Sequence, residues 1–286
     1  MNTVPLQERD RPPAGWDSAL PAMKRPRRSR IGEYLEATLT IVDLEVRKLR
    51  HDPTELLTRA VQPVLWLLLF GEVFTRVRGI PTGRLHYLDF MAAGILAQSA
   101  LFISIFYGIS VIWDRDMGIL VKFLASPAPR TAQVLGKALA AGMRGMAQAI
   151  IVYFLTLLLG VKLNWSPLAL LGVLAFVLVG SALFSTFSLL IACLVKTQQR
   201  FMGIGQLITM PLFFASNAIY PIALMPAWLQ VVSRINPLTY QVDGIRTLML
   251  AGGTSSYGLG LDMGVLMAVA ALLILLSGKL YPTIVT

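Results

Sequence analysis

The chain has 286 residues, of which 56% are hydrophobic and only 14% are charged, and its mean hydropathy is +0.67. Soluble domains carry about 25% charged residues, so this composition excludes an ordinary soluble protein and indicates a membrane protein with several spans. The formal net charge of +10 is spread over the flanks of the apolar runs, and the basic run near the N-terminus has no interleaved aromatic residue. We therefore do not expect nucleic acid as a partner.

The N-terminal part is polar and precedes the first apolar run. Residues 1–30 are rich in proline and arginine and predict a disordered basic cytoplasmic tail, whose arginines either set the topology or touch anionic lipid headgroups. Residues 31–52 place apolar side chains three and four positions apart, which is typical of an amphipathic helix. We expect this helix to lie at the membrane surface against lipid and to end before Pro53.

Six apolar runs follow, and each is long enough to cross a bilayer core. They cover residues 56–74, 88–113, 135–161, 168–195, 201–220 and 263–280. Prolines interrupt the stretch between the fifth and sixth runs, which predicts a segment that re-enters the membrane without crossing it. Lysine and arginine are more frequent on one set of flanks, which favours a cytoplasmic N-terminus and C-terminus.

The predicted fold class is therefore an all-α integral membrane protein. Its transmembrane domain covers residues 56–282 and has six transmembrane helices, with an N-terminal interfacial helix and a re-entrant external hairpin between helices 5 and 6. Among the charged residues inside the runs, Arg144 lies about two turns into the third helix, and we expect it to snorkel to the cytoplasmic face.

Residues 211–246, PLFFASNAIYPIALMPAWLQVVSRINPLTYQVDGIR, form the most informative stretch. Ser216 and Asn217 interrupt an apolar run, and their hydrogen-bonding groups need partners in lipid. They either line a wet pathway or cap a helix that is about to break. Phe213 next to them either presents an apolar surface to a substrate or packs within the protein.

The same stretch contains a second helix start. Asn236 and Pro237 can begin a helix, because proline fixes the first turn. Asp243 and Arg246 are three residues apart, which allows an ion pair on that helix. We interpret these residues as structural determinants of an outer gate before we interpret them as ligands.

The loop between the second and third predicted helices reads DRDMGILVKFLASP over residues 114–127 and predicts a short helix on the membrane surface. Asp114 and Asp116 stand at its start, where carboxylates favour the helix dipole. One face carries an apolar stripe that needs either lipid or a protein groove. The stripe consists of Met117, Leu120, Val121 and Leu124.

The order SNAxxP, MPxWLQ and NPLTYxVDxxR resembles the ABC-2 type transporter permeases, and it is most similar to their drug-resistance exporter branch. The resemblance implies that residues 31–52 are either the family's connecting helix or an ordinary interfacial anchor. It also implies that the acidic loop helix couples to an ATPase, with Asp116 and Gly118 at the positions that mark it. The implied coupling residues are Asp114, Asp116, Gly118, Leu120 and Leu124. The implied residues of the translocation path or outer gate are Phe213, Ser216, Asn217, Asn236, Pro237 and Arg246.

The resemblance also implies a function. It predicts a permease subunit in the cell (inner) membrane that exports an amphipathic drug-like or lipid-like substrate, using ATP hydrolysed by a separate ATP-binding subunit. The implied assembly is a homodimer of permeases with two ATPase subunits. ATP and magnesium would then be bound by the partner ATPase subunit, and this chain would hold no cofactor and no metal.

Three other functions would need different residues or a different cargo. A permease for lipid-linked oligosaccharide or polysaccharide export fits the same architecture. An ATP-independent secondary transporter needs ionisable residues at the midplane, and the runs offer almost none. A membrane-embedded enzyme needs a convergent catalytic set. The sequence contains no GxxxxGK[ST], HExxH or GxSxG motif and has only two histidines, so we predict no catalytic residue.

Overall fold

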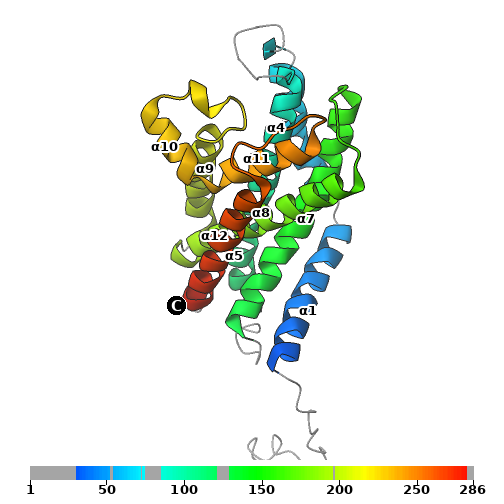
Figure 1. Cartoon of the computed structure of the whole chain (residues 1–286). Coiled ribbons are helices and arrows are strands. Elements are labelled where there is room, and N and C mark those ends of the chain that lie inside the picture. The colour runs from blue at the N-terminus through cyan, green and yellow to red at the C-terminus, as the bar shows by residue number, and fades with distance from the viewer. Residues whose placement is uncertain are drawn as a thin grey trace, which may run out of the picture.

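The computed structural model of the chain describes residues 30–51, 54–71, 73–74, 85–120, 129–195 and 197–281. Within these ranges all regular elements are helical, and the one β-type pairing is an isolated bridge between Leu163 and Leu250. Figure 1 shows the long helices packed side by side, with the short helices of the region after α9 gathered at one end of the bundle. The predicted tail lies outside the described residues except for Arg30.

The helices follow the predicted runs closely. In chain order they are α1 (Arg30–His51), α2 (Thr54–Leu65), the π-helix η3 (Trp66–Gly71), α4 (Tyr87–Tyr107), α5 (Ile109–Asp116), α7 (Arg130–Leu158), α8 (Pro167–Leu194), α9 (Gln198–Phe214), the 3-10 helix η4 (Ile222–Leu224), α10 (Ala227–Ile235), α11 (Pro237–Met249) and α12 (Leu259–Leu280). Helices α7, α9 and α12 begin three to five residues before the predicted runs, whereas α7 and α9 end at Leu158 and Phe214, before the predicted ends at 161 and 220.

Four stretches of the described chain are long and apolar enough to cross a membrane. They are Tyr87–Asp116, Arg130–Leu158, Pro167–Leu194 and Leu259–Leu280. An all-helical fold with four such stretches is that of an integral membrane protein. The first and fifth predicted spans correspond to α2 with η3 and to α9, and α2 and α9 have only 12 and 17 residues. Six spans therefore remain a prediction.

Helix α4 is the centre of the bundle. It packs against α7, α8, α9 and α11, and most of its residues are buried. The predicted second span is not one straight helix, because the chain is interrupted at Gly108 and continues as α5. Gly108 lies directly against the side chain of Ser188 on α8, whose hydroxyl donates to the carbonyl of Ile105. Helix α8 therefore packs directly against the point where α4 ends and α5 begins.

Helix α1 lies along α7 (Figure 1). Thr38, Ile41 and Glu45 are buried on this contact, and Gly136 of α7 lies against the side chain of Ile41. The apolar stripe at the start of α1 is exposed on another face, with Ile31 74% and Leu39 63% accessible. The placement of this stripe in the membrane interface remains a prediction.

The chain after α9 folds back onto the bundle. It turns at residues 215–221, forms η4 and α10, and then enters α11, which packs against α4, α8 and α12. Close backbone approach makes this return possible. Gly94 of α4 faces the turn, and a Cβ atom added there would strike the carbonyl oxygen of Ala218 and lie 2.7 Å from its carbonyl carbon. Backbone atoms cannot move aside as a flexible side chain can.

We therefore expect Gly94→Ala to destabilise the protein by about 1–3 kcal/mol, because the added methyl group overpacks a backbone contact. Unfolding in mixed detergent micelles measures the effect. The matched control is Gly264→Ala on α12, where an added Cβ has no atom within 4 Å. This control should be neutral or stabilise the helix by up to about 1 kcal/mol. Equal stability of the two variants would contradict the close approach of α4 and the turn.

Candidate ligand cavity and buried ion pairs

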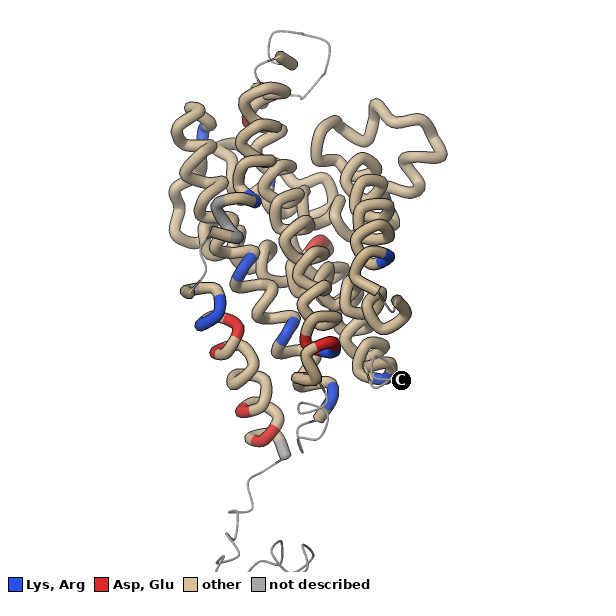
Figure 2. The backbone as a smooth tube through the Cα atoms, turned by 180° about the vertical axis from the view of Figure 1, so that it is seen from behind, with Lys and Arg blue, Asp and Glu red and all other residues tan. Residues whose placement is uncertain are grey.

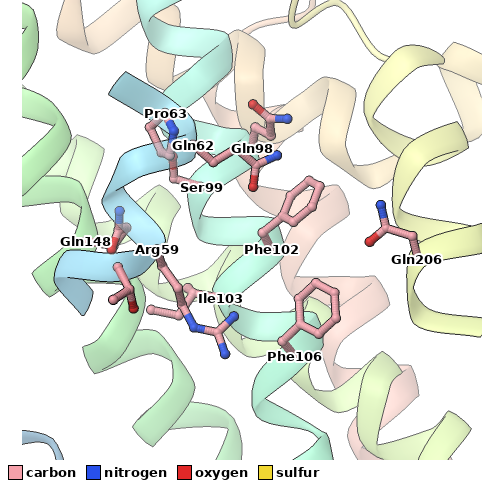
Figure 3. Close-up of a pocket in the computed structure, with 11 residues that line it drawn as sticks. Arg59, Gln62, Pro63, Gln98, Ser99, Phe102, Ile103, Phe106, Gln148 and Gln206 are labelled. Carbon is pink, nitrogen blue, oxygen red and sulfur yellow. The ribbon is translucent and has the colours of Figure 1, made fainter. Parts of the chain in front are cut away.

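An open cavity of about 370 Å³ lies between α2, α4, α7 and α9. Each of these helices contributes one glutamine to its wall, and α4 also contributes two phenylalanines (Figure 3). The four glutamines are Gln62, Gln98, Gln148 and Gln206. The volume lies within the range of small-molecule sites, which are usually apolar clefts with a few convergent polar groups.

Two of these glutamines are buried without hydrogen-bond partners. Gln98 is 2% exposed and Gln148 is 1% exposed. Within the described part of the chain, Nε2 of Gln98 and both amide atoms of Gln148 make no hydrogen bond. Because buried polar groups are almost always paired, these atoms require an explanation. Their position on the wall of a cavity means that a bound molecule or water can supply the partner.

The other side of the cavity is aromatic. The rings of Phe102 and Phe106 are 6.2 Å apart, and both point toward the side on which Gln206 of α9 lies (Figure 3). The guanidinium carbon of Arg59 lies 5.6 Å from the centre of the Phe106 ring. The wall thus combines apolar ring faces with amide groups, a combination that suits an amphipathic molecule.

The predicted path residues after α9 do not line this cavity. Phe213 is fully buried and packs edge-on against Trp66 at 5.8 Å, so its side chain serves packing. The hydroxyl of Ser216 donates to the carbonyl of Phe213 at 2.7 Å and accepts from the N–H of Ala218 at 3.3 Å. Ser216 therefore caps the end of α9, which is the second of the two alternatives that the sequence left open.

Asn236 and Pro237 begin α11, as the sequence predicts. Oδ1 of Asn236 accepts from the N–H of Leu238 at 3.0 Å, and Pro237 is the first helical residue. The amide nitrogen of Asn236 also donates to the carbonyl of Leu212 at 2.6 Å. This single side chain therefore caps α11 and ties it to the end of α9.

The predicted ion pair between Asp243 and Arg246 is wrong. Nη2 of Arg246 donates to the carbonyl oxygens of Asn217 at 2.7 Å and Phe90 at 3.2 Å, and its guanidinium lies 3.6 Å from the Phe90 ring centre. Asp243 instead accepts from the hydroxyl of Ser255 at 2.7 Å. The two side chains point to different segments because each satisfies polar groups buried beside α11.

The predicted start of the surface helix at residues 114–127 is wrong, whereas the helix after Gly118 stays a prediction. Asp114 and Asp116 lie in the last turn of α5 and do not begin a helix. The helix of the second predicted span continues through them and ends before Gly118, whose positive φ of 69° few other residues adopt easily. Residues 121–128, and with them Leu124, lie outside the described residues.

The predicted apolar stripe of this loop is split between two environments. Leu120 is completely buried and packs with Val111 and Leu189. Met117 is 64% exposed, and Trp113, one turn earlier, is 47% exposed. The residues at the end of α5 that a partner can reach are therefore Trp113, Asp116, Met117 and Gly118. Whether any of them couples to an ATPase remains a prediction.

Buried ion pairs fasten this end of the molecule together. Nζ of Lys137 on α7 lies 2.6 Å from Oδ2 of Asp114 on α5. Nη2 of Arg144 on α7 lies 3.3 Å from Oε2 of Glu45 on α1, and Lys48 contacts the other oxygen of Glu45 at 3.0 Å. Figure 2 shows the charged residues gathered mainly on α1 and toward the lower half of the bundle. The pairs join α1, α5 and α7.

The snorkelling predicted for Arg144 is wrong, since its side chain is buried and also lies over the ring of Tyr107 at 4.8 Å. Sequence reasoning missed Glu45 as its partner. A signal was present in the helical spacing, because Thr38, Ile41 and Glu45 share one face that is distinct from the exposed stripe. Glu45 alone does not show which cation on another helix it meets.

Charge around Glu45 outweighs its burial. Burial by itself raises the pKa of the carboxyl group, but the nearby cations of Lys137, Lys48 and Arg144 together lower the pKa below its ordinary value. The carboxylate is therefore ionised at neutral pH and balances the charge of Arg144.

We expect Glu45→Gln to destabilise the protein by about 3 kcal/mol, because Arg144 loses its buried counter-charge. Asp43→Asn on the same helix is the matched control, since it breaks the pair with Arg47, in which both side chains are exposed. The control should cost less than about 1 kcal/mol. Detergent unfolding at neutral pH measures both variants, and equal losses would refute a buried pair between α1 and α7.

The same pair predicts a pH dependence. The folded pKa of Glu45 is lower than its ordinary value of 4.5, so the stability contributed by the ionised group is present above pH 4.5 and is lost as the pH falls through the folded pKa. The difference in stability between the wild-type protein and Glu45→Gln should therefore shrink below pH 4.5. Unfolding curves recorded from neutral pH to about pH 3 measure it. A difference that stays constant over this range would contradict the lowered pKa.

Comparisons with known proteins agree with this architecture. The putative transport permease ycf38 of Cyanophora paradoxa is 31% identical over 218 residues, which cover 75% of this chain and 74% of the relative. The daunorubicin resistance ABC transporter permease protein DrrB1 of Streptomyces coeruleorubidus is 26% identical over 254 residues, which cover 89% and 86%. Nodulation protein J of Rhizobium meliloti (strain 1021) is 26% identical over 227 residues, which cover 79% and 84%.

The sequence model of the ABC-2 type transporter family matches residues 36–250. This range begins inside α1 and ends at Leu250, directly after α11. It contains the cavity, the buried ion pairs of α1, α5 and α7, and the contacts of Arg246. The chain is a multi-pass membrane transport protein and belongs to the ABC-2 type transporter family.

Proposed function

We propose that this chain is the permease subunit of an ATP-driven exporter, and that ATP and magnesium are bound by a separate ATP-binding subunit. Family membership supports the transport role. The observation that carries the proposal further is the end of α5, where Trp113 and Met117 are exposed beside the buried pair of Asp114 and Lys137. The end of α5 is apolar and exposed, and an ion pair joins it to α7. Such an arrangement suits a contact through which movement of an ATPase subunit reaches the membrane helices.

The proposed assembly contains two copies of this chain and two ATPase subunits in the cell (inner) membrane. Each permease crosses the membrane six times, with both termini in the cytoplasm and with α10 and α11 forming a re-entrant hairpin near the outer face. The side chain of Arg246, held by the carbonyls of Asn217 and Phe90, supports a fixed outer end. Phe213, Ser216, Asn236 and Pro237 shape the same end through packing and capping.

In the proposed mechanism, ATP binding closes the ATPase subunits, which push the end of α5. The pair of Asp114 with Lys137 passes this movement to α7, and the pair of Arg144 with Glu45 passes it to α1. A ligand can shift such an equilibrium only by binding one state better than the other. The exported molecule is amphipathic, either drug-like or lipid-like, because the cavity wall combines phenylalanine rings with amides.

The test is affinity purification of the chain from its native membranes in mild detergent. An ATP-binding subunit should co-purify in a fixed ratio. Met117→Asp should reduce its recovery about tenfold or more, because a carboxylate is costly to bury in an apolar contact. Met117 is exposed, so the change leaves the permease core intact, whereas Leu120→Asp would disrupt it.

Ala251→Asp is the matched control, because Ala251 is also exposed but lies in the loop after α11, at the opposite end of the molecule. It should leave the recovery of the ATPase unchanged. If Met117→Asp retains the ATPase as well as the control does, the end of α5 is not the contact. If no ATPase co-purifies with the wild-type chain under several detergents, an ATP-independent secondary transporter becomes the better proposal.

A further inference from the structure

Two buried carboxyl groups meet between α11 and α12. Asp243 lies on α11 and Asp262 in the first turn of α12, and both side chains are buried. Oδ2 of each group contacts the hydroxyl of Ser255, at 2.7 Å for Asp243 and 3.3 Å for Asp262, and the two carboxyl groups are within hydrogen-bond reach of each other. Two ionised carboxylates in this position would repel each other, because burial removes the screening by water. The contact therefore needs a proton or a cation.

The hydrogen-bond donors around the pair serve one of the two groups. Oδ2 of Asp243 accepts from the hydroxyl of Ser255 and from the N–H groups of Ser256 at 2.8 Å and Tyr257 at 3.4 Å. A hydroxyl has a single hydrogen, so Ser255 cannot also donate across the longer distance to Asp262. Oδ1 of Asp262 is buried and makes no hydrogen bond within the described part of the chain. The surroundings thus suit a carboxylate at Asp243 and a neutral carboxylic acid at Asp262.

The nearby positive charge balances one carboxylate. Arg246 lies one helical turn after Asp243 on α11 and interacts with it electrostatically. The hydrogen bonds of Arg246 go to the carbonyls of Asn217 and Phe90, so its guanidinium does not reach across to α12. Ionised Asp243 and Arg246 together are neutral. Ionisation of Asp262 as well would leave a net negative charge in the interior, which is strongly unfavourable.

The other elements packed around α11 and α12 keep their charged groups away from the pair or at its rim. Helix α8 contacts both helices, and its sequence contains no acidic or basic residue. Helix α7 approaches the far end of α12, where Gly278 lies against Thr131. On α4, Asp89 accepts from the N–H of Lys162. The charged and titratable groups at the rim are Arg234, Tyr240 and Tyr257.

We propose that Asp243 and Asp262 share one proton at neutral pH, and that this proton holds α12 against α11. Asp262 carries the proton as a carboxylic acid and donates a hydrogen bond to the carboxylate of Asp243. Such charge-assisted bonds are stronger than bonds between neutral groups. When the proton leaves, two buried anions face each other and the contact between the helices weakens. A metal cation between the carboxylates is the competing occupant, but the O–H and N–H groups that point at Asp243 suit an anion.

The first test is infrared spectroscopy of the full chain in dodecyl maltoside micelles, whose detergent has no carbonyl group. The carbonyl stretch of a protonated carboxylic acid lies apart from the bands of amides and carboxylates. We expect this band at neutral pH, and Asp262→Asn should remove it. The matched control is Asp89→Asn, because Asp89 is also a buried acid in the first turn of a long helix but accepts from a backbone N–H. The control should leave the band in place.

The second test measures what the proton contributes to stability. Asp262→Asn still places a hydrogen-bond donor beside Asp243 but has no proton to lose in the range tested. The folded wild-type chain holds a proton that the unfolded chain releases, so its stability should fall as the pH rises. Between about pH 5 and about pH 8, the unfolding temperature of the wild-type chain should fall by about 5 °C relative to that of Asp262→Asn.

Three results would overturn the proposal. The first is the absence of the band from the wild-type chain at neutral pH, which needs no variant. The second is a band that Asp262→Asn leaves in place. The third is an unfolding temperature of the wild-type chain that is higher in sodium or calcium chloride than in choline chloride, with no such effect in Asp262→Asn, which would assign the space to a metal cation. Since no ATPase is present, failure here leaves the co-purification test of the proposed function intact.

Discussion

Arg246 donates hydrogen bonds to backbone carbonyls at a place where the chain stops being helical inside a membrane protein. At such a break the backbone carbonyls lose their helical partners, and within the protein they have no access to bulk water. The guanidinium group of Arg246 donates to the carbonyl of Asn217 in the turn after α9 and to that of Phe90 in α4. It also stacks on the Phe90 ring. One side chain thus holds together the turn, α11 and the central helix.

The rest of this end of the molecule is consistent with that arrangement. Asn236 caps α11 and donates to a carbonyl in the last turn of α9. Asp243 accepts a hydrogen bond from Ser255 and so holds the loop before α12 against α11. Gly94 lets the turn after α9 approach α4 to backbone contact. Asn236, Asp243 and Arg246 therefore each hydrogen-bond backbone groups of the segments around α11.

The opposite end is held by charge. Paired ions of α1, α5 and α7 are nearly inaccessible, and breaking one partner leaves the other buried without balance. The cavity lies between these two ends, against α4, and its wall includes buried amide atoms of Gln98 and Gln148 that have no hydrogen-bond partner among the described residues.

The sequence alone determines the helical elements, because the length of each apolar run and the position of Asn236 before Pro237 act locally. It also identifies the family through motifs that are contiguous in the chain. The partners of charged and polar side chains depend on which helices become neighbours, and no local pattern encodes this. The pairs of Arg144 with Glu45 and of Lys137 with Asp114 join residues 99 and 23 positions apart, and Arg246 reaches a carbonyl 156 positions away. The cavity likewise collects its glutamines from four helices, so only the tertiary structure decided where it lies.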